Sequence, residues 1–105
     1  MKVLVIAKLH DDATREYVAP HARSQAAAIW NAYKRNQLRE MYYWPKGDQP
    51  GGAVLVYEAD TVDAVQALIQ SLPIAQAGLV DFDVYVLEPY ANVEMLFASV
   101  VDQAT

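Results

Sequence analysis

The fold of this chain is decided by the stretch Asp81-Phe82-Asp83-Val84-Tyr85-Val86-Leu87-Glu88. Its residues alternate between two kinds of side chain. One set is wholly apolar (Phe82, Val84 and Val86), whereas the other mixes two carboxylates with a phenol and a leucine. A period of two is typical of a β-strand whose faces meet different surroundings. We therefore expect a strand with its apolar face in the core and its mixed face against solvent or the wall of a polar site.

Three more strands are predicted upstream of this one. Residues 3–9 and 53–58 are apolar on both faces, as expected of strands that are buried on both sides. Residues 37–44 alternate, which predicts one face made of Leu38, Glu40, Tyr42 and Trp44 and another made of Arg39, Met41 and Tyr43. Residues 45–52 are rich in glycine and proline, and this composition predicts a hairpin loop between the second and third strands.

Two helices are predicted between the strands. The first lies between Thr14 and Asn36, with a short lead-in and then a main helix that carries Pro20 in its first turn, where a missing N–H does no harm. We expect its apolar stripe to be buried; it consists of Ala22, Ala26, Ile29 and Tyr33, with Trp30 beside it. The second helix is capped by Asp60 or Thr61, and its stripe consists of Val62, Val65, Leu68, Ile69 and Leu72.

The resulting order is strand, helix, strand, strand, helix, strand, which predicts a ferredoxin-like α+β fold with a four-stranded antiparallel sheet. We expect one domain over residues 1–105, with a core over 1–90 and an apolar arm over 91–105. Two helices cover only one face of such a sheet. The other face is therefore expected to pack on the sheet of an identical subunit, which gives a homodimer or a higher oligomer, and the arm is expected to reach across.

Composition excludes several classes of partner. The net charge of −5 and the absence of a basic patch argue against nucleic acid as a partner. The chain has no cysteine, which removes disulfides and thiolate metal sites and is consistent with a reducing compartment. The apolar run after Met1 is too short for a signal or membrane segment. We expect a soluble, cytoplasmic protein with no membrane partner.

Several segments together resemble the muconolactone isomerase family. They are residues 57–68, the turn Leu72-Pro73-Ile74, the strand over 81–87, and Arg39 within an aromatic-rich second strand. The resemblance covers most of residues 1–90 and implies a dimeric α+β barrel. Residues 20–26 differ from the acid-rich start of the first helix in the family isomerases. The wider barrel group also contains cofactor-free monooxygenases and proteins without established activity, so the fold alone does not select a reaction.

Three residues are candidates for catalysis. His21 is a candidate base or acid, because histidine is the side chain that ordinarily titrates near neutrality; the alternative is a surface or capping histidine. Glu40 shares a face with Tyr42 and Trp44, which would desolvate its carboxylate and suit it to proton transfer. Arg39 is a candidate anchor for a carboxylate or an enolate. The alternative for the Arg39 side chain is a cross-strand or intersubunit ion pair with Asp81 or Asp83.

Aromatic residues are the candidates for substrate binding. Seven tyrosines against two phenylalanines supply apolar walls with hydroxyl groups, which suits a flat or ring-shaped ligand. The expected substrate-binding residues are Trp30, Tyr33, Tyr42, Trp44, Tyr57 and Tyr85. His10 and His21 lack the spacing of metal ligands, so we expect no metal and no organic cofactor.

Three functions follow from these candidates. The first is a small cofactor-free enzyme that acts on a cyclic or aromatic metabolite by proton transfer, as in isomerisation of a lactone or enone. The second is a cofactor-independent monooxygenase that holds a phenolic or polyketide-type substrate while oxygen reacts. The third is a non-catalytic, ligand-binding or accessory dimer.

Overall fold

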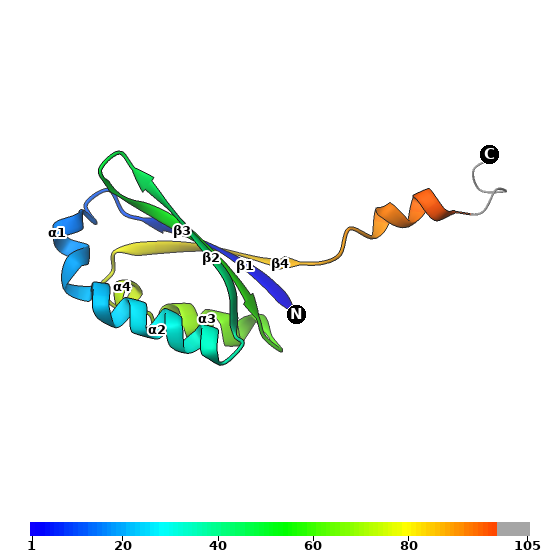
Figure 1. Cartoon of the computed structure of the whole chain (residues 1–105), viewed down its shortest axis with the longest axis horizontal. Helices are drawn as coiled ribbons and strands as arrows, with labels where there is room; N and C mark the ends of the chain where they lie inside the picture. The colour runs from blue at the N-terminus through cyan, green and yellow to red at the C-terminus, as the bar shows by residue number, and fades with distance from the viewer. Residues whose placement is uncertain (99–105) are drawn as a thin grey trace.

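A four-stranded antiparallel sheet forms the framework of the protein. The computed structural model describes residues 1–98. The strands are β1 (Lys2–Leu9), β2 (Leu38–Lys46), β3 (Gln49–Glu58) and β4 (Val80–Leu87), and their spatial order is β2-β3-β1-β4 (Figure 1). This order, with helices in both crossovers, confirms the predicted ferredoxin-like α+β fold.

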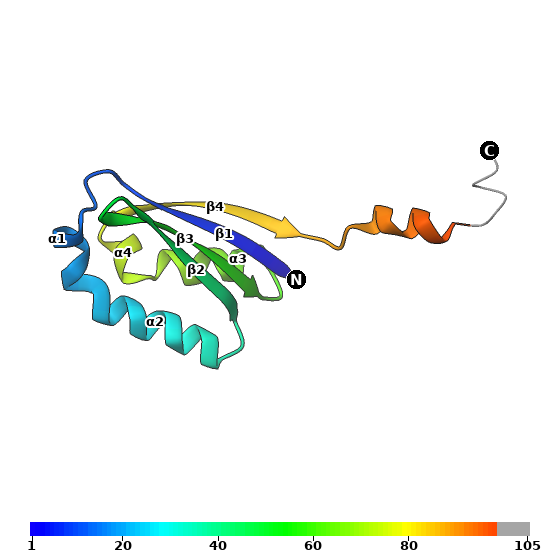
Figure 2. The same ribbon diagram turned by 45° about the horizontal axis from the view of Figure 1, so that its top comes forward.

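The helices of the body lie on one face of the sheet (Figure 2). The first crossover contains α1 (Arg15–Val18), η1 (Ala19–His21) and α2 (Ala22–Lys34), and the second contains α3 (Val62–Gln70) and α4 (Pro73–Gln76). Pro20 lies in the η1 turn just before α2, where it removes no hydrogen bond from the helix interior. Thr61 is the N-cap of α3, because its hydroxyl accepts a 3.1 Å hydrogen bond from the backbone N–H of Ala64.

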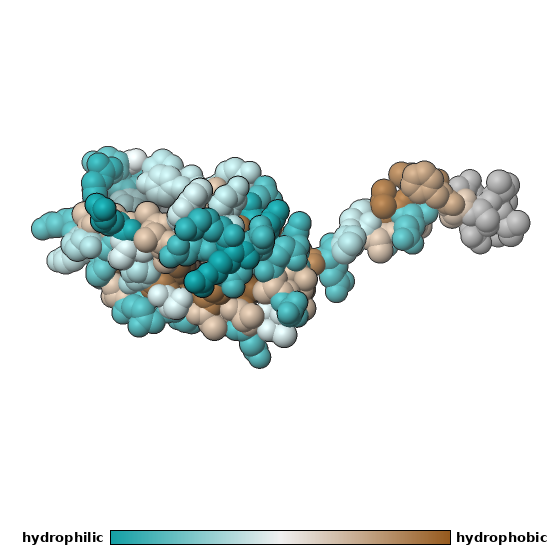
Figure 3. Space-filling view, turned by 60° about the horizontal axis from the view of Figure 1, so that its bottom comes forward, coloured by the Kyte–Doolittle hydropathy of each residue, from teal (hydrophilic) through white to brown (hydrophobic). Residues whose placement is uncertain are grey.

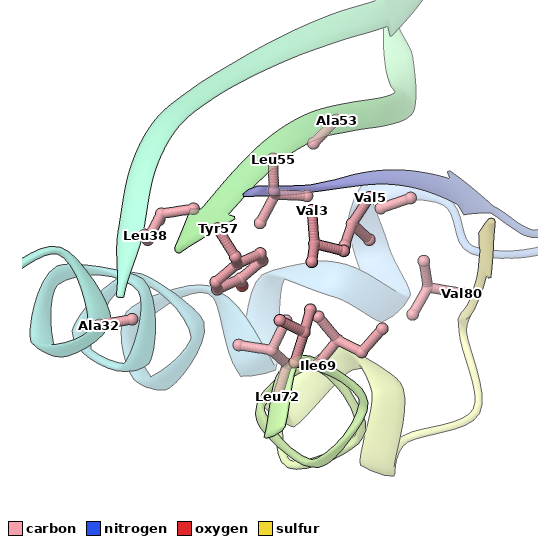
Figure 4. Close-up of a cluster of buried hydrophobic side chains, with 12 residues drawn as sticks. Val3, Val5, Ala32, Leu38, Ala53, Leu55, Tyr57, Ile69, Leu72 and Val80 are labelled. Atoms are coloured by element: carbon pink, nitrogen blue, oxygen red, sulfur yellow. The ribbon is translucent and has the colours of Figure 1, made fainter. Parts of the chain in front are cut away.

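The core lies between the sheet and α3. Val3 and Val5 of β1 point toward the helices together with Leu55 and Tyr57 of β3, and they meet Ile69 of α3 (Figure 4). Val65 of α3 belongs to the same buried cluster. The six largest buried side chains are less than 2% exposed, namely Val3, Val5, Leu55, Tyr57, Val65 and Ile69. Full burial of one aliphatic side chain of this size stabilises a fold by about 1.5–3 kcal/mol. In the predicted stripe of the second helix, Val65, Leu68, Ile69 and Leu72 are therefore confirmed as part of the core, whereas Val62 is half-buried and lies outside the cluster.

The other sheet face is uncovered. We expected β1 and β3 to be buried on both sides, yet Leu4, Ile6, Val54 and Val56 are only half-buried in the single chain. The reason is that every helix of the body packs against the opposite face. We call the uncovered surface, which also carries Glu40, Tyr42, Trp44, Lys8, Asp81, Asp83, Tyr85 and Leu87, the open face.

The predicted face assignment of β2 is wrong at its start. A β-bulge interrupts the pairing of β2 with β3 between Leu38 and Glu40, so Arg39 is an extra residue. Leu38 is consequently buried in the core instead of sharing a face with Glu40, Tyr42 and Trp44. Met41 and Tyr43 lie on the same side of β2 as Leu38, where they line a cavity.

The hairpin between β2 and β3 is tighter than predicted. Pairing continues to Lys46 and Gln49, so only Gly47 and Asp48 form the turn, and the predicted loop over 45–52 is mostly strand. Gly47 has a φ of 64°, which glycine adopts without strain and which a two-residue hairpin turn requires. Pro45 and Pro50 are tolerated because β2 is an edge strand and the register is irregular there.

After β4, the chain leaves the body. The 3₁₀ helix η2 (Ala91–Phe97) projects beyond the end of the sheet (Figure 1), and the molecule consequently measures 63 × 31 × 19 Å. Met95, Leu96 and Phe97 are 72%, 75% and 83% exposed. We call residues 90–98 the arm; the rest of the predicted arm, residues 99–105 with Val100, lies outside the described residues. Within residues 1–98, no helix is long and apolar enough to cross a membrane.

Candidate functional site

A cavity of about 640 Å³ lies between α2 and the start of β2. It exists because α2 presents alanine to the sheet at Ala22 and Ala26, where larger side chains would fill the space. Only Ala32 of α2 is buried. The lining is mostly apolar and consists of Val18, Ala22, Gln25, Ala26, Ile29, Trp30, Tyr33, Leu38, Arg39, Glu40 and Met41.

The predicted buried stripe of the main helix is this cavity wall. Ala22, Ala26 and Tyr33 are exposed in the chain, so the expectation that they would be buried is wrong, and Ile29 is only half-buried. Helical spacing correctly placed them on one side of α2. It could not show that α2 stands away from β2 instead of packing on it.

A second, smaller cavity of about 210 Å³ continues the first along the sheet. The two share Val18, Ala22, Gln25 and Met41 as lining residues. The Gln25 side chain accepts a 3.2 Å hydrogen bond from the backbone N–H of Ile74, which ties α2 to α4 behind the cavities. The combined space is within the range that holds a drug-sized organic molecule.

Two aromatic rings and one cation border the cavity. Trp30 and Tyr33 stack, with ring centroids 5.4 Å apart and an interplanar angle of 22°. The bulge in β2 places Arg39 close by, and its guanidinium Nη1 donates a 3.0 Å hydrogen bond to Asn36 Oδ1. The cavity lining thus combines the flat, apolar rings of Trp30 and Tyr33 with the hydrogen-bond donors of the Arg39 guanidinium.

Glu40 connects this cavity with the open face. The residue borders the cavity, but its carboxylate Oε1 accepts a 3.1 Å hydrogen bond from the Tyr42 hydroxyl, which belongs to the open face. The bond to this carboxylate raises the pKa of the Tyr42 phenol. Arg39 and Glu40 therefore both border the cavity, although strict strand alternation had placed them on opposite faces.

The remaining predicted site residues lie elsewhere. His21 is half-buried in η1 and does not line the cavity. Tyr57 is a core residue, 1% exposed, and burial raises the pKa of its phenol to about 12. Trp44 and Tyr85 are on the open face with Tyr42. The structure thus brings together Trp30, Tyr33, Arg39 and Glu40 and leaves the other candidates outside this cavity.

Within the chain, neither aspartate of β4 pairs with Arg39. Asp83 Oδ2 lies 2.6 Å from Lys8 Nζ, and Asp81 Oδ2 lies 3.0 Å from His10 Nε2. The first ion pair joins β4 to its neighbour β1, and the second joins β4 to the residue that directly follows β1. The described residues contain no group of three histidine, aspartate or glutamate side chains that could hold a metal ion.

Sequence reasoning missed part of the lining, namely Val18, Gln25 and Met41. One signal for the cavity was present: two alanines four residues apart on the helix side that holds Trp30 and Tyr33.

Comparison with known proteins identifies the fold only. The sequence matches no family model, and no curated protein matches it. Solved structures do match. One is 5-chloro-2-hydroxyhydroquinone dehydrochlorinase (TftG) from Burkholderia phenoliruptrix, in complex with 2,5-dihydroxybenzoquinone, with a TM-score of 0.72 and 16% identity over 84% of this chain and 94% of that one.

Another similar structure is a putative antibiotic biosynthesis monooxygenase from Deinococcus radiodurans. Its TM-score is 0.50, with 13% identity over 88% of this chain and 97% of that one. These likenesses confirm the ferredoxin-like α+β fold. The finer resemblance to the muconolactone isomerase family stays a prediction.

Proposed function

We propose that this protein is a small enzyme that binds a cyclic or aromatic metabolite in the cavity between α2 and β2 and transfers a proton on it, without a metal or an organic cofactor. The observation that carries the proposal is the arrangement of the cavity wall. Apolar side chains and the stacked pair Trp30 and Tyr33 suit a flat ring, while Arg39 and Glu40 border the same space.

The proposed reaction is isomerisation through an enolate. The Glu40 carboxylate takes a proton from a carbon next to a carbonyl group, and the electron pair of the broken C–H bond moves to the carbonyl oxygen. The Arg39 guanidinium donates hydrogen bonds to this oxygen as negative charge develops. Glu40 then returns the proton to a different carbon of the conjugated system, which moves a double bond and regenerates the carboxylate.

Glu40 is preferred over His21 as the base because of its position. Glu40 borders the cavity, whereas His21 does not. The exposed phenol of Tyr33 is a second donor within the lining and is assigned to the same oxygen as Arg39. The similar structure of the dehydrochlorinase supports a ring-shaped substrate by analogy of fold, because it holds a dihydroxybenzoquinone.

The test is exchange of carbon-bound hydrogen in D₂O. A panel of butenolide lactones and cyclic enones is incubated with the protein, and deuterium incorporation is followed by NMR. For any compound that exchanges, Glu40→Gln is expected to slow exchange by about 10²–10⁴-fold, the range of general acid–base catalysis. Arg39→Gln removes the oxyanion donor and is expected to slow it by about 10²–10³-fold.

Asp63→Asn serves as the matched control, because Asp63 is an exposed acid in the first turn of α3 and is not part of the cavity. An unchanged exchange rate in Glu40→Gln would show that Glu40 is not the base. If exchange were lost in His21→Ala instead, the base would be assigned to His21. Tight binding of a panel compound without exchange would identify a binding protein in place of an isomerase.

A second candidate is oxygenation of an electron-rich phenol. It is favoured by the half-exposed Trp30 ring, 57% accessible, which offers a stacking surface at the cavity. The similar structure of a putative monooxygenase supports it by fold analogy. Oxygen uptake with a phenolic substrate, without added cofactor, distinguishes it from isomerisation, which consumes no oxygen.

A further inference from the structure

The described chain has two unpartnered apolar surfaces besides the cavity. One is the open face of the sheet, with half-buried Leu4, Ile6, Val54 and Val56 at its centre. The other is the arm, whose apolar residues appear in Figure 3 as a patch well away from the body. The protein is expected to cover both in solution, because exposed apolar surface of this kind marks an interaction site.

The pairing registers show that the open face is self-complementary. One row across the sheet reads Glu40, Val56, Leu4, Tyr85, and the next reads Tyr42, Val54, Ile6, Asp83. Consider a second copy whose open face lies against the first, related by a two-fold axis that runs between the sheets parallel to the strands. Each row then faces the same row of the second copy, read in the opposite direction. This arrangement sets Glu40 near the partner's Tyr85 and Tyr42 near the partner's Asp83, with aliphatic side chains between them, so that a phenol meets a carboxylate at both edges.

The same axis brings the arm to the cavity of the second copy. It places β4 of one copy beside β2 of the other, with the two strands running in opposite directions. One row across the sheet reads Val86, Val3, Tyr57, Leu38. The end of β4, at Val86 and Leu87, is therefore level with Leu38, the first residue of β2. The chain after Leu87 therefore emerges beside the part of the partner's β2 that borders the partner's cavity.

The arm is long enough to enter that cavity. Residues 88–90 extended and η2 in its 3₁₀ form together span about 24 Å. Two facing sheets are about 10 Å apart, and a helix layer lies about 10 Å behind a sheet. Within its own subunit, the arm starts at the opposite edge of the sheet, with β1 and β3 between β4 and β2 and with α3 packed beneath the sheet.

We infer that the cavity is closed by a second copy of this chain, whose arm seats Leu96 and Phe97 against Trp30 and Tyr33. The site is then incomplete in a single subunit, and the arm supplies its apolar lid. This inference goes beyond the proposed reaction, because a closed cavity serves an enzyme and a binding protein equally.

The absence of cysteine allows a direct test by cross-linking. One preparation carries Ala26→Cys in the cavity wall, another carries Phe97→Cys in the arm, and the two are mixed, allowed to exchange subunits and oxidised mildly. The expected product is a covalent dimer that contains one chain of each kind. A mixture of Asp63→Cys and Phe97→Cys is the control, and it is expected to give little product, because Asp63 lies on α3 outside the cavity.

Two outcomes would overturn the inference. Cross-linking in the control mixture at the same rate as in the test mixture would indicate random collision. A disulfide that forms only within single chains carrying both Ala26→Cys and Phe97→Cys would show that the arm folds back on its own cavity.

A fluorescence measurement separates arm docking from dimer formation. In a Trp44→Phe background, Trp30 is the only tryptophan, and replacing both Leu96→Ser and Phe97→Ser is expected to shift its emission to longer wavelength while native mass spectrometry still shows a dimer. Asn92→Ser, a substitution of a polar arm residue, should leave the emission unchanged. Unchanged emission in the doubly substituted arm, or a monomer before any substitution, would refute the proposal. Neither test uses a substrate, so the outcome is independent of the proposed reaction.

Discussion

His10 Nε2 lies 3.0 Å from the carboxylate Oδ2 of Asp81, at the end of the β1–β4 pairing. The hydrogen bond that His10 donates to the Asp81 carboxylate is the main cause that raises the pKa of His10 above its ordinary value of 6.5. A group whose pKa is raised on folding stabilises the protein fully below its unfolded pKa, and the contribution is lost as the pH rises through the folded value. This ion pair is therefore expected to favour the folded state in mildly acidic solution.

An NMR titration checks this expectation with little overlap, since the chain has only two histidines. His10 is expected to titrate above 6.5, and Asp81→Asn is expected to lower its pKa. Asp60→Asn, which changes an exposed carboxylate away from His10, is the matched control. An identical His10 titration in Asp81→Asn would show that the pair does not form in solution.

The stacked rings of α2 give a prediction about binding. Trp30→Ala removes the larger ring of the pair, and aromatic stacking is worth about 0.5–1.5 kcal/mol beyond the buried area. A flat ring ligand is therefore expected to bind up to roughly tenfold more weakly, as measured by calorimetry. Tyr17→Ala is the control, because Tyr17 is equally exposed but belongs to α1 outside the cavity. Equal losses of affinity in both variants would argue against a ligand at the α2 stack.

The close approach of Trp44 to the third strand predicts a sensitive glycine. A Cβ at Gly52 would collide with the Ala7 carbonyl oxygen and with the Trp44 ring. Gly52→Ala is expected to lower the free energy of unfolding by about 1–3 kcal/mol, as overpacking typically does. Urea denaturation followed by circular dichroism measures the change, and a midpoint identical to that of the parent would show that the backbone yields without cost.

The buried phenol of Tyr57 predicts loss of stability in alkali. Burial raises its pKa to about 12, so between pH 10 and 12 the unfolded chain loses its phenolic proton before the folded chain does. The folded state binds more protons there, and stability falls as the pH rises. Tyr57→Phe is expected to make this fall shallower, whereas Tyr17→Phe, which changes an exposed tyrosine, is not. Denaturation midpoints at several pH values measure this fall. If the Tyr57 phenol were hydrated instead of buried, the midpoints of the parent and of Tyr57→Phe would fall equally steeply with pH.

Much of the fold was predictable from local patterns. The alternation in residues 81–88 correctly placed Phe82 and Val84 toward the core, although the third residue of that set, Val86, is 47% exposed. Thr61 was one of the two expected caps. These features depend on neighbours in sequence, which periodicity and capping rules describe directly. The order of strands and helices along the chain then predicted the ferredoxin-like topology, and the observed sheet has this topology.

The site was less predictable, because it depends on distances between elements. No local pattern shows that α2 stands away from β2, since the same stripe serves a core or a cavity. The aromatic residues show the same difficulty. Tyr33 borders the cavity, Tyr57 is in the core and Tyr85 is on the open face, although all three are the same residue type.

The bulge at Arg39 lets one edge strand serve both sides of the sheet. Leu38 faces the core and Glu40 faces outward although they are two residues apart, and the extra residue between them allows this. Deletion of Arg39 would make Leu38 and Glu40 neighbours, so regular alternation would keep both orientations and those of the rest of β2. A single codon deletion would therefore remove the guanidinium from the cavity border and leave the outer surface of the sheet unchanged.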